Sequence, residues 1–573
     1  MRRKHALSLL MLSMGVALLV AATTVGVASA SSHHASAKAG GVLTVSQAGA
    51  AYDTLDPQLA YVTNDWLLLD STQLLLVNFP DKGGKAGTQL FPEAAKSFPI
   101  ISNGGKTYTF HLRSGLKFSD GSPVTAAAYQ RAFERVLSPK MYAQYGTFDQ
   151  IDQWLVGGQK FAKTGPYSKE SNPPAHISGI KAKGLTLTIH LVKPVPQFTS
   201  VMAMQWFGAV KPNMPYAKSK AQERVYPSAG PYHIVSNNLT SLTVLKKNPY
   251  WASDKIPGKR PANAKEIIIH SYGSSSGEAQ LLQTEKGQLD VDLGVIPPSD
   301  EPKLDKTYGK NKPNGQYHVG TTSCIDWYEL NNGKGPFASI AARKAANYAL
   351  GRGEFITLAG KDSGSPADQL LVPGIPGYKK INTYPSIPNI PKAKSVGGGA
   401  INGNVNILYI STDPFQAPAA QYIQRQLQGL GFKTTLDPNA NPNDYYAALE
   451  TKATAEGSGG YDIAWGGWCA DYFDPFDYFN VNLDGRTIAD TGNVDYFYFN
   501  NASFDNQMDK AAAKSGSARA AAYANLDKEL MSKYVPFVPF EDGNNLALTA
   551  KGVGNWIYSN YFGGPYLNAL TVK

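Results

Sequence analysis

The alternation of expected strands and helices across residues 405–465 constrains the fold of this chain more than any other feature. Apolar runs predict strands at 405–410, 432–436 and 461–465. Residues 417–430 have the period of an amphipathic helix, which Gly431 ends. Strands that alternate with helices predict a parallel sheet, and such sheets bind ligands at the carboxyl ends of their strands.

The last of these strands runs into an unusual set of residues. Trp465, Trp468 and Cys469 precede Asp471, the only acid between Asp462 and Asp474. A carboxylate among aromatic side chains at a strand end is suited to bind a ligand amine. The alternative is structural, with Asp471 as a turn residue and Trp468 as a core aromatic.

The N-terminus has the features of a signal peptide over residues 1–30. Arg2, Arg3 and Lys4 precede an apolar run at 7–20, and Ala28-Ser29-Ala30 fits a cleavage site. Ser31 stands where a lipid-modified precursor has cysteine, so we expect no lipid anchor. Residues 31–40 are small and polar, which is typical of a flexible segment. The sequence therefore predicts export to the periplasm or the cell exterior.

Length and composition indicate a globular protein of two or three domains. The chain has 573 residues, of which 43% are hydrophobic and 17% charged. The net charge of +10 becomes +7 without the three basic residues of the leader, which has no acid. That excess is modest and no basic run concentrates it, so we expect no nucleic-acid partner.

Two cysteines, Cys324 and Cys469, are present. In an oxidising compartment an even pair most simply forms one disulfide. The alternative is two buried free thiols. Their spacing matches no metal site, and the sequence has no H-E-x-x-H motif, so neither a metal nor another cofactor is expected.

Several motifs together resemble the family 5 solute-binding proteins, which are the extracytoplasmic receptors of ABC importers. The main one is YTFHLRSGLKFSDGSPVTA at residues 108–126, which begins in an expected half-buried strand and ends at Thr125, the expected N-cap of a helix. The others, in chain order, are Leu55-Asp-Pro57, Gly230-Pro-Tyr232, Asn248-Pro-Tyr-Trp251 and Gly287-Gln-Leu-Asp290. The segments Cys324–Asn332 and Gly467–Asp471 are similar to cysteine-bearing segments of oligopeptide-binding members.

The resemblance implies an α/β fold of the periplasmic-binding-protein type II class, cluster C. It has two α/β lobes around a ligand cleft and an extra domain. The expected ranges are 41–83, 224–323 and 543–573 for lobe 1, 84–223 for domain II and 324–542 for lobe 2. The resemblance also implies a disulfide between Cys324 and Cys469.

By the same resemblance, Asp471 is the expected anchor for the ammonium of a bound peptide. Trp468 and Cys469 lie beside it, and Glu329 is a weaker candidate whose alternative role is a hinge salt bridge. Trp465 departs from the family, because oligopeptide receptors have Arg at the similar position. We therefore expect an altered preference for ligand length or C-terminal charge, with apolar side chains against the two tryptophans.

The predicted function is capture of peptides, and the expected partners are the peptide and the permease subunits of an ABC importer, with the binding protein a monomer. An alternative is the same fold with another solute, such as a sugar or a nickel chelate. A second alternative is a serine hydrolase, because Gly273-Ser-Ser-Ser-Gly277 fits G-x-S-x-G with Ser275 as nucleophile. The only later histidine is His318, which does not fit the hydrolase order, so we expect no enzyme activity.

Overall fold

The structure is a computed structural model of the chain. It describes residues 40–572 apart from 49–53, 142–150, 167–174, 217–224, 239, 259, 273–276 and 458–459. The predicted signal peptide, residues 31–39 of the segment after it and Ser275 lie outside the described residues.

One sheet of eleven strands runs through both lobes. Its order is β15 (Lys433–Asn439), β14 (Asn404–Ile410), β16 (Ile463–Cys469), β12 (Tyr317–Leu330), β17 (Phe537–Thr549), β11 (Val291–Asp292), β1 (Val42–Ala48), β10 (Glu266–Tyr272), β9 (Leu242–Lys247) and β8 (Tyr232–Asn238), with β13 (Gly364–Pro366) also paired to β17.

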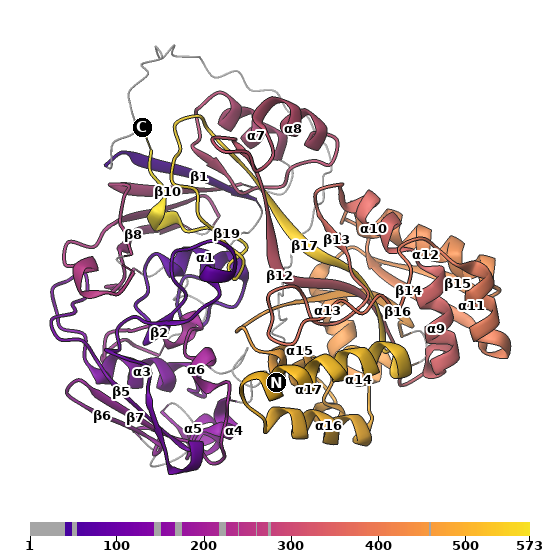
Figure 1. The fold of residues 1–573 in the computed structure, drawn as a ribbon, viewed down its shortest axis with the longest axis horizontal. Coiled ribbons are helices and arrows are strands. Elements are labelled where there is room, and N and C mark those ends of the chain that lie inside the picture. The colour runs from indigo at the N-terminus through magenta and orange to yellow at the C-terminus, as the bar shows by residue number, and fades with distance from the viewer. Residues whose placement is uncertain are drawn as a thin grey trace.

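The predicted strand and helix pattern of lobe 2 is confirmed. Strand β14 is parallel to both β15 and β16. Helix α12 (Gln416–Leu430) joins β14 to β15, and its C-cap is Gly431 at φ 127°, a conformation that favours glycine. Helices α9 (Ile340–Ala349), α10 (Arg352–Ala359) and α11 (Ile390–Gly397) lie with α12 in the outer part of this lobe (Figure 1).

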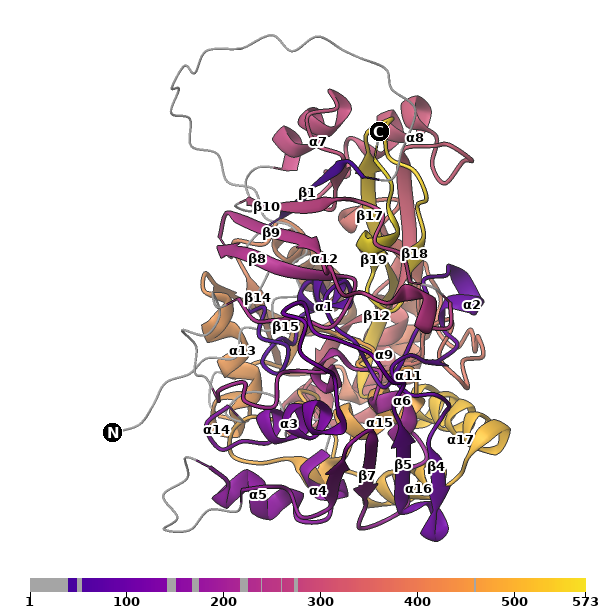
Figure 2. The ribbon, with the colours of Figure 1, turned by 90° about the vertical axis from the view of Figure 1, so that its left-hand side faces the viewer.

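Two long antiparallel strands connect the lobes. β12 and β17 pair along most of their length and run from lobe 1 into lobe 2 (Figures 1 and 2). Their register shifts between Thr321 and Ile325, where the Thr322 hydroxyl donates to the Gly543 carbonyl oxygen at 2.8 Å. The register shift lies beside residues 323/324 and 542/543, and the domain boundaries expected there stay predictions.

Domain II contains a separate antiparallel sheet. Its strand order is β4 (Ile100–Ser102), β5 (Thr107–His111), β7 (Thr186–His190) and β6 (Ile180–Lys183). Its helices are α3 (Ala126–Val136), α4 (Ile151–Trp154), α5 (Gly158–Thr164) and α6 (Phe198–Val201). Thr125 is the N-cap of α3 as predicted, although its side chain makes no capping hydrogen bond.

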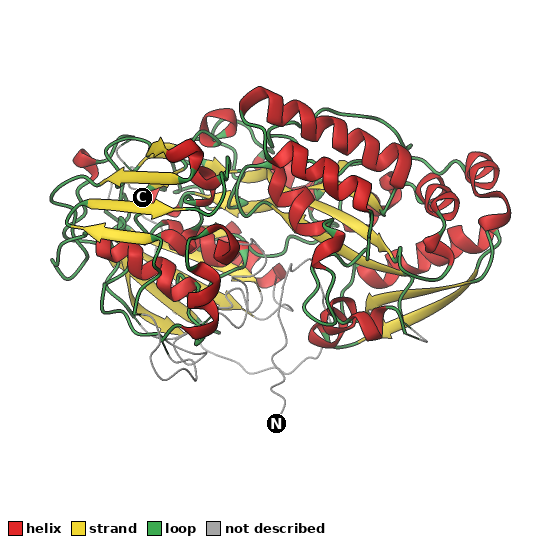
Figure 3. Ribbon diagram, turned by 90° about the horizontal axis from the view of Figure 1, so that it is seen from below, coloured by secondary structure: helices red, strands yellow, loops and turns green. Residues whose placement is uncertain are grey.

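The other elements surround these sheets (Figure 3). The remaining helices are α1 (Thr63–Asp70), α2 (Gly84–Gly87), α7 (Gly277–Glu285), α8 (Glu301–Tyr308), α13 (Pro442–Glu450), α14 (Lys452–Ala455), α15 (Pro475–Asn482), α16 (Ala502–Ala512) and α17 (Gly516–Glu529). The short strand pairs are β2 (Val77–Asn78) with β3 (Phe91–Pro92) and β18 (Tyr558–Ser559) with β19 (Gly564–Pro565). In the described part of the chain, no helix has the length and apolarity to cross a membrane.

The largest cluster of buried apolar side chains connects all three regions. It includes Phe110 of domain II, Trp66 of lobe 1 and Trp468 of lobe 2. A shared core of this kind means that the lobes are packed against each other around the end of β16, where the candidate site lies.

Candidate functional site

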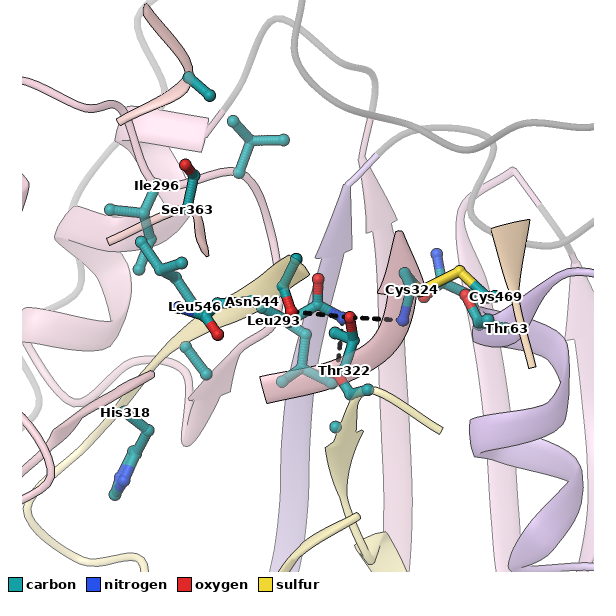
Figure 4. A pocket seen from close by; sticks show the side chains of 18 of the residues that line it. Thr63, Leu293, Ile296, His318, Thr322, Cys324, Ser363, Cys469, Asn544 and Leu546 are labelled. Carbon is teal, nitrogen blue, oxygen red and sulfur yellow. Dashed lines mark hydrogen bonds between the residues drawn. A yellow bond between two sulfur atoms is a disulfide. The ribbon is translucent and has the colours of Figure 1, made fainter. Parts of the chain in front are cut away.

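The two cysteines form a disulfide between neighbouring strands. Cys324 on β12 is the direct cross-strand partner of Cys469 on β16, and their Cα atoms are 4.0 Å apart. The predicted pairing is therefore confirmed. Figure 4 shows the disulfide bordering a cavity close to Thr63 of α1. It joins β12 to β16, the strand whose end carries Asp471.

Asp471 lies two residues beyond β16 and is in contact with two segments of lobe 1. The Tyr61 hydroxyl donates to its Oδ2 at 2.9 Å, and the Tyr561 hydroxyl donates to its backbone carbonyl at 2.5 Å. The residue is only 6% exposed. A carboxylate that follows β16 is thus in contact with Tyr61 and Tyr561, two residues far from it in the chain.

Asp477 of α15 holds this region in place. Its Oδ2 accepts the backbone N–H of Asp471 at 2.8 Å and the indole N–H of Trp468 at 3.2 Å. Helix α15 starts here because the Asp474 side chain caps it by accepting the N–H of Phe476. The orientation of Trp468 and the path of the chain at Asp471 therefore depend on the same carboxylate.

One edge of β16 has no strand partner over most of its length. β12 pairs with all of β16, from Ile463 to Cys469. On the other side, the register with β14 covers only Ile463 and Ala464 among the described residues. The Trp465 carbonyl on this side accepts the Tyr445 hydroxyl at 2.7 Å. Because backbone groups alternate along a strand, those of Gly467 and Cys469 point to the same open edge.

Trp465 lies between two cavities. The smaller, of about 30 Å³, is lined by aromatic side chains that include Tyr61, Trp327 and Trp468. The larger, of about 280 Å³, is also lined by Cys469 and contains residues of both lobes (Figure 4). Trp465 is 4% exposed and lines both cavities, so its side chain is part of the site.

Glu329 lines neither of these two cavities. It is completely buried and accepts the indole N–H of Trp327 at 2.6 Å. Burial raises its pKa well above the usual range, with a smaller contribution from Asp495. In this structure Glu329 fixes the Trp327 side chain through this hydrogen bond and makes no salt bridge with the described residues.

The larger cavity is acidic. Glu301, Asp326 and Glu541 line it, and no Lys or Arg stands among its described lining residues. His318 lines it at the end opposite the disulfide and stacks on Trp556, with ring centroids 3.9 Å apart. Burial lowers the pKa of His318 to about 4, so this ring is neutral at neutral pH. No group of three or more side chains that could hold a metal occurs in the described residues.

Four residues of the site were not predicted from the sequence: Tyr61, Asp477, Asp326 and Glu541. Tyr61 is 410 residues from Asp471 in the chain, and no local pattern connects them. Asp326 did carry a signal, because it is one of two acids, with Glu329, in the mostly apolar strand segment that follows Cys324.

Comparison with known proteins gives one consistent family. The sequence profile of "Bacterial extracellular solute-binding proteins, family 5 Middle" matches residues 89–490. The oligopeptide-binding protein OppA of Bacillus subtilis is 24% identical over 498 residues, which are 82% of this chain and 85% of that protein.

Solved structures share the fold. The clavulanic acid biosynthesis oligopeptide binding protein 2 superposes with a TM-score of 0.81 at 20% identity, covering 93% of this chain and 96% of the other. OppA of Haemophilus influenzae, in complex with RPPGFSPFR, superposes with a TM-score of 0.70 at 21% identity, covering 94% and 99%. With the profile match over most of the chain, these likenesses establish that the protein belongs to the family 5 bacterial extracellular solute-binding proteins.

Proposed function

We propose that this protein is the peptide-binding component of an ABC importer. It would capture short peptides between its lobes outside the cytoplasmic membrane and deliver them to the permease. The observation that carries the proposal is the enclosed carboxylate of Asp471 at the end of an open strand edge. The oligopeptide-binding names of the relatives and the nonapeptide bound to the Haemophilus protein support it.

The peptide would bind as an added strand along the open edge of β16. Its backbone would pair with Gly467 and Cys469, a mode of recognition that is independent of peptide sequence. Its N-terminal ammonium would pair with Asp471, so the peptide would run antiparallel to β16. Deletion of one partner in an enclosed charge pair typically costs about 2 to 5 kcal/mol of binding free energy.

This binding mode also predicts which side chains of the peptide would enter each of the two cavities. Successive side chains of an extended peptide point to opposite faces. One set would enter the smaller aromatic cavity beside Trp468, and the other set would enter the larger cavity beside Cys469. Trp465, which lines both, would contact side chains of either set.

The proposed location outside the cytoplasmic membrane rests on the N-terminal sequence and on the family. Residues 1–30 would be removed as a signal peptide, and Ser31 after the expected cleavage site gives no cysteine for lipid attachment.

Mass spectrometry of ligands released on denaturation of the purified mature protein tests the proposal. We expect short peptides with free N-termini from the wild type and much less from Asp471→Asn. An exposed-acid variant, Asp490→Asn, is the matched control and should retain the wild-type peptides. Recovery of a sugar, a metal chelate or another solute without an amine would contradict the peptide function and keep the fold.

A further inference from the structure

Two carboxylates, the partly buried Asp326 and the buried Glu541, face each other in the larger cavity. Asp326 on β12 and Glu541 on β17 are direct cross-strand partners, and both line the cavity. Glu541 is 5% exposed, and its Oε1 is buried without a hydrogen-bond partner in the described part of the chain. The Ser363 hydroxyl, which lines the same cavity, donates to the Gly360 carbonyl oxygen at 2.8 Å. A buried oxygen without a partner is costly, and here it borders an open space.

Among the residues that the structure describes, no Lys or Arg lines the cavity to compensate this pair. The neighbouring titratable groups are acidic or neutral: Glu301 of α8, Asp413 before α12, Tyr328 and His318 of β12, Tyr446 of α13 and Asp542 of β17. Burial, strengthened by Glu541, raises the pKa of Asp326 well above its usual range, and burial raises the pKa of Glu541 to about 7. The cavity therefore favours a positively charged guest that would restore both carboxylates to their ionised form.

The walls beside the acids are apolar. Trp465, Phe415 and Phe540 line the same cavity. Aromatic faces of this kind pack against the methylene groups of a long side chain and attract the charge at its end. The volume of about 280 Å³ is just below the usual range for ligand pockets, which suits one side chain better than a whole ligand.

From this geometry we infer that the larger cavity is a side-chain pocket for Lys or Arg of the bound peptide, with Asp326 and Glu541 as the residues that recognise its charge. We call it the acidic pocket. The inference rests on the proposed peptide function and goes beyond it by naming a class of peptide. It also revises the expectation that Trp465 favours apolar side chains, because the acids beside Trp465 select a cation.

The acidic pocket is within reach of alternate residues of the added strand. Trp465 and Cys469 are on one face of β16, and their cross-strand partners Tyr328 and Cys324 share that face with Asp326. A peptide on the open edge directs every second side chain to this face. A Lys or Arg should thus increase the binding affinity at some positions of the peptide and not at the adjacent positions.

Calorimetric titration with a scanned set of peptides tests the inference. Each position of a tri-alanine or tetra-alanine peptide is replaced in turn by Lys and by norleucine, which has the four side-chain carbons of Lys without the ammonium group. At one position or at alternate positions, we expect the wild type to bind the Lys peptide about tenfold or more tightly than the norleucine peptide. This comparison needs no variant and does not depend on the folding of any mutant.

The double variant Asp326→Asn/Glu541→Gln tests whether the preference for Lys over norleucine arises in the acidic pocket. Its ratio of Lys to norleucine affinity should fall close to one. The matched control removes two exposed acids, Glu278→Gln/Asp490→Asn, and should keep the wild-type ratio, since the net charge changes equally.

The outcomes separate the two proposals. If alanine peptides bind but Lys and norleucine are equivalent at every position, the acidic pocket is refuted and the peptide function stands. If none of the peptides binds, the peptide function itself fails. Titration with 1,5-diaminopentane alone identifies a free amine as the ligand, and tight binding of it would overturn the assignment to a peptide side chain.

Discussion

Two groups of carboxylates, each buried or partly buried, have different electrostatic surroundings in this protein. Near the junction of lobe 1 and domain II, Asp70, Asp81 and Glu93 all surround Arg260, with contacts of 2.6, 3.1 and 2.7 Å to its guanidinium. In the acidic pocket, Asp326 and Glu541 have no such partner in the described residues. Both groups are enclosed, but only the first contains its own cation.

The difference separates a structural acid cluster from a binding one. Burial lowers the pKa of Arg260, but the three carboxylates raise it by more, so the guanidinium stays charged and offsets part of the negative charge of the cluster within the fold. The pair in the acidic pocket is left for a ligand to neutralise. Buried acids alone are therefore no sign of function. Buried acids that border a cavity and have no counter-ion do indicate a binding site.

The largest expected effect comes from removing the internal cation. Arg260→Met leaves three buried carboxylates unpaired and should lower the free energy of unfolding by about 3 to 5 kcal/mol, measured by chemical denaturation. The exposed Arg425→Met change is the matched control and should have little effect. Equal stability of the two variants would show that the Arg260 cluster is not structural.

Neutralising the acidic pocket should raise the free energy of unfolding, by less than the loss of Arg260 lowers it. The Glu541 pKa is about 7 in the folded protein and near 4.5 in the unfolded chain, so the folded state holds its proton longer. Stability of the ligand-free wild type should fall as pH rises from about 4.5 to 7, and the penalty is absent below that window.

Denaturation of the ligand-free protein at several pH values measures this effect. At pH 8, Asp326→Asn/Glu541→Gln should be more stable than the wild type by roughly 2 kcal/mol, and the difference should vanish near pH 4. Glu301 and Asp413 titrate in both proteins, so their effects cancel in the comparison. A variant less stable than the wild type at pH 8 would contradict the account.

The smallest effect is expected on the preference for Lys peptides, when a substitution places a cation of the protein itself in the acidic pocket. Trp465→Arg places a guanidinium in the cavity that Asp326 and Glu541 line. The ratio of Lys to norleucine affinity should drop by about tenfold, or ~1.4 kcal/mol. Trp465→Phe keeps the aromatic wall without the charge and should retain most of the preference. Loss of the preference in both variants would attribute it to the indole ring.

Local patterns predicted much of lobe 2. Helix α12, its end at Gly431 and the parallel strands β14 to β16 follow from periodicity over a short stretch of chain. The position of Asp471 beyond a strand end follows from the same pattern. The disulfide was implied by the resemblance to the family.

Contacts between distant segments could not be predicted in this way. The pairing of β12 with β17 sets Asp326 against Glu541, and strand pairing across such a separation has no signature in either segment. Tyr61 reaches Asp471 only because the lobes meet. The open edge of β16 depends on where β14 stops pairing, which is a property of the sheet and not of one strand.

The most direct test of the peptide function is a double-mutant cycle on the ammonium pair. The affinity of one peptide, with a free and with an acetylated N-terminus, is measured for the wild type and for Asp471→Asn. We predict that acetylation weakens binding to the wild type by at least about 30-fold and has little further effect in the variant. Equal affinity of the wild type for the free and the acetylated peptide would contradict the role of Asp471 as the ammonium anchor.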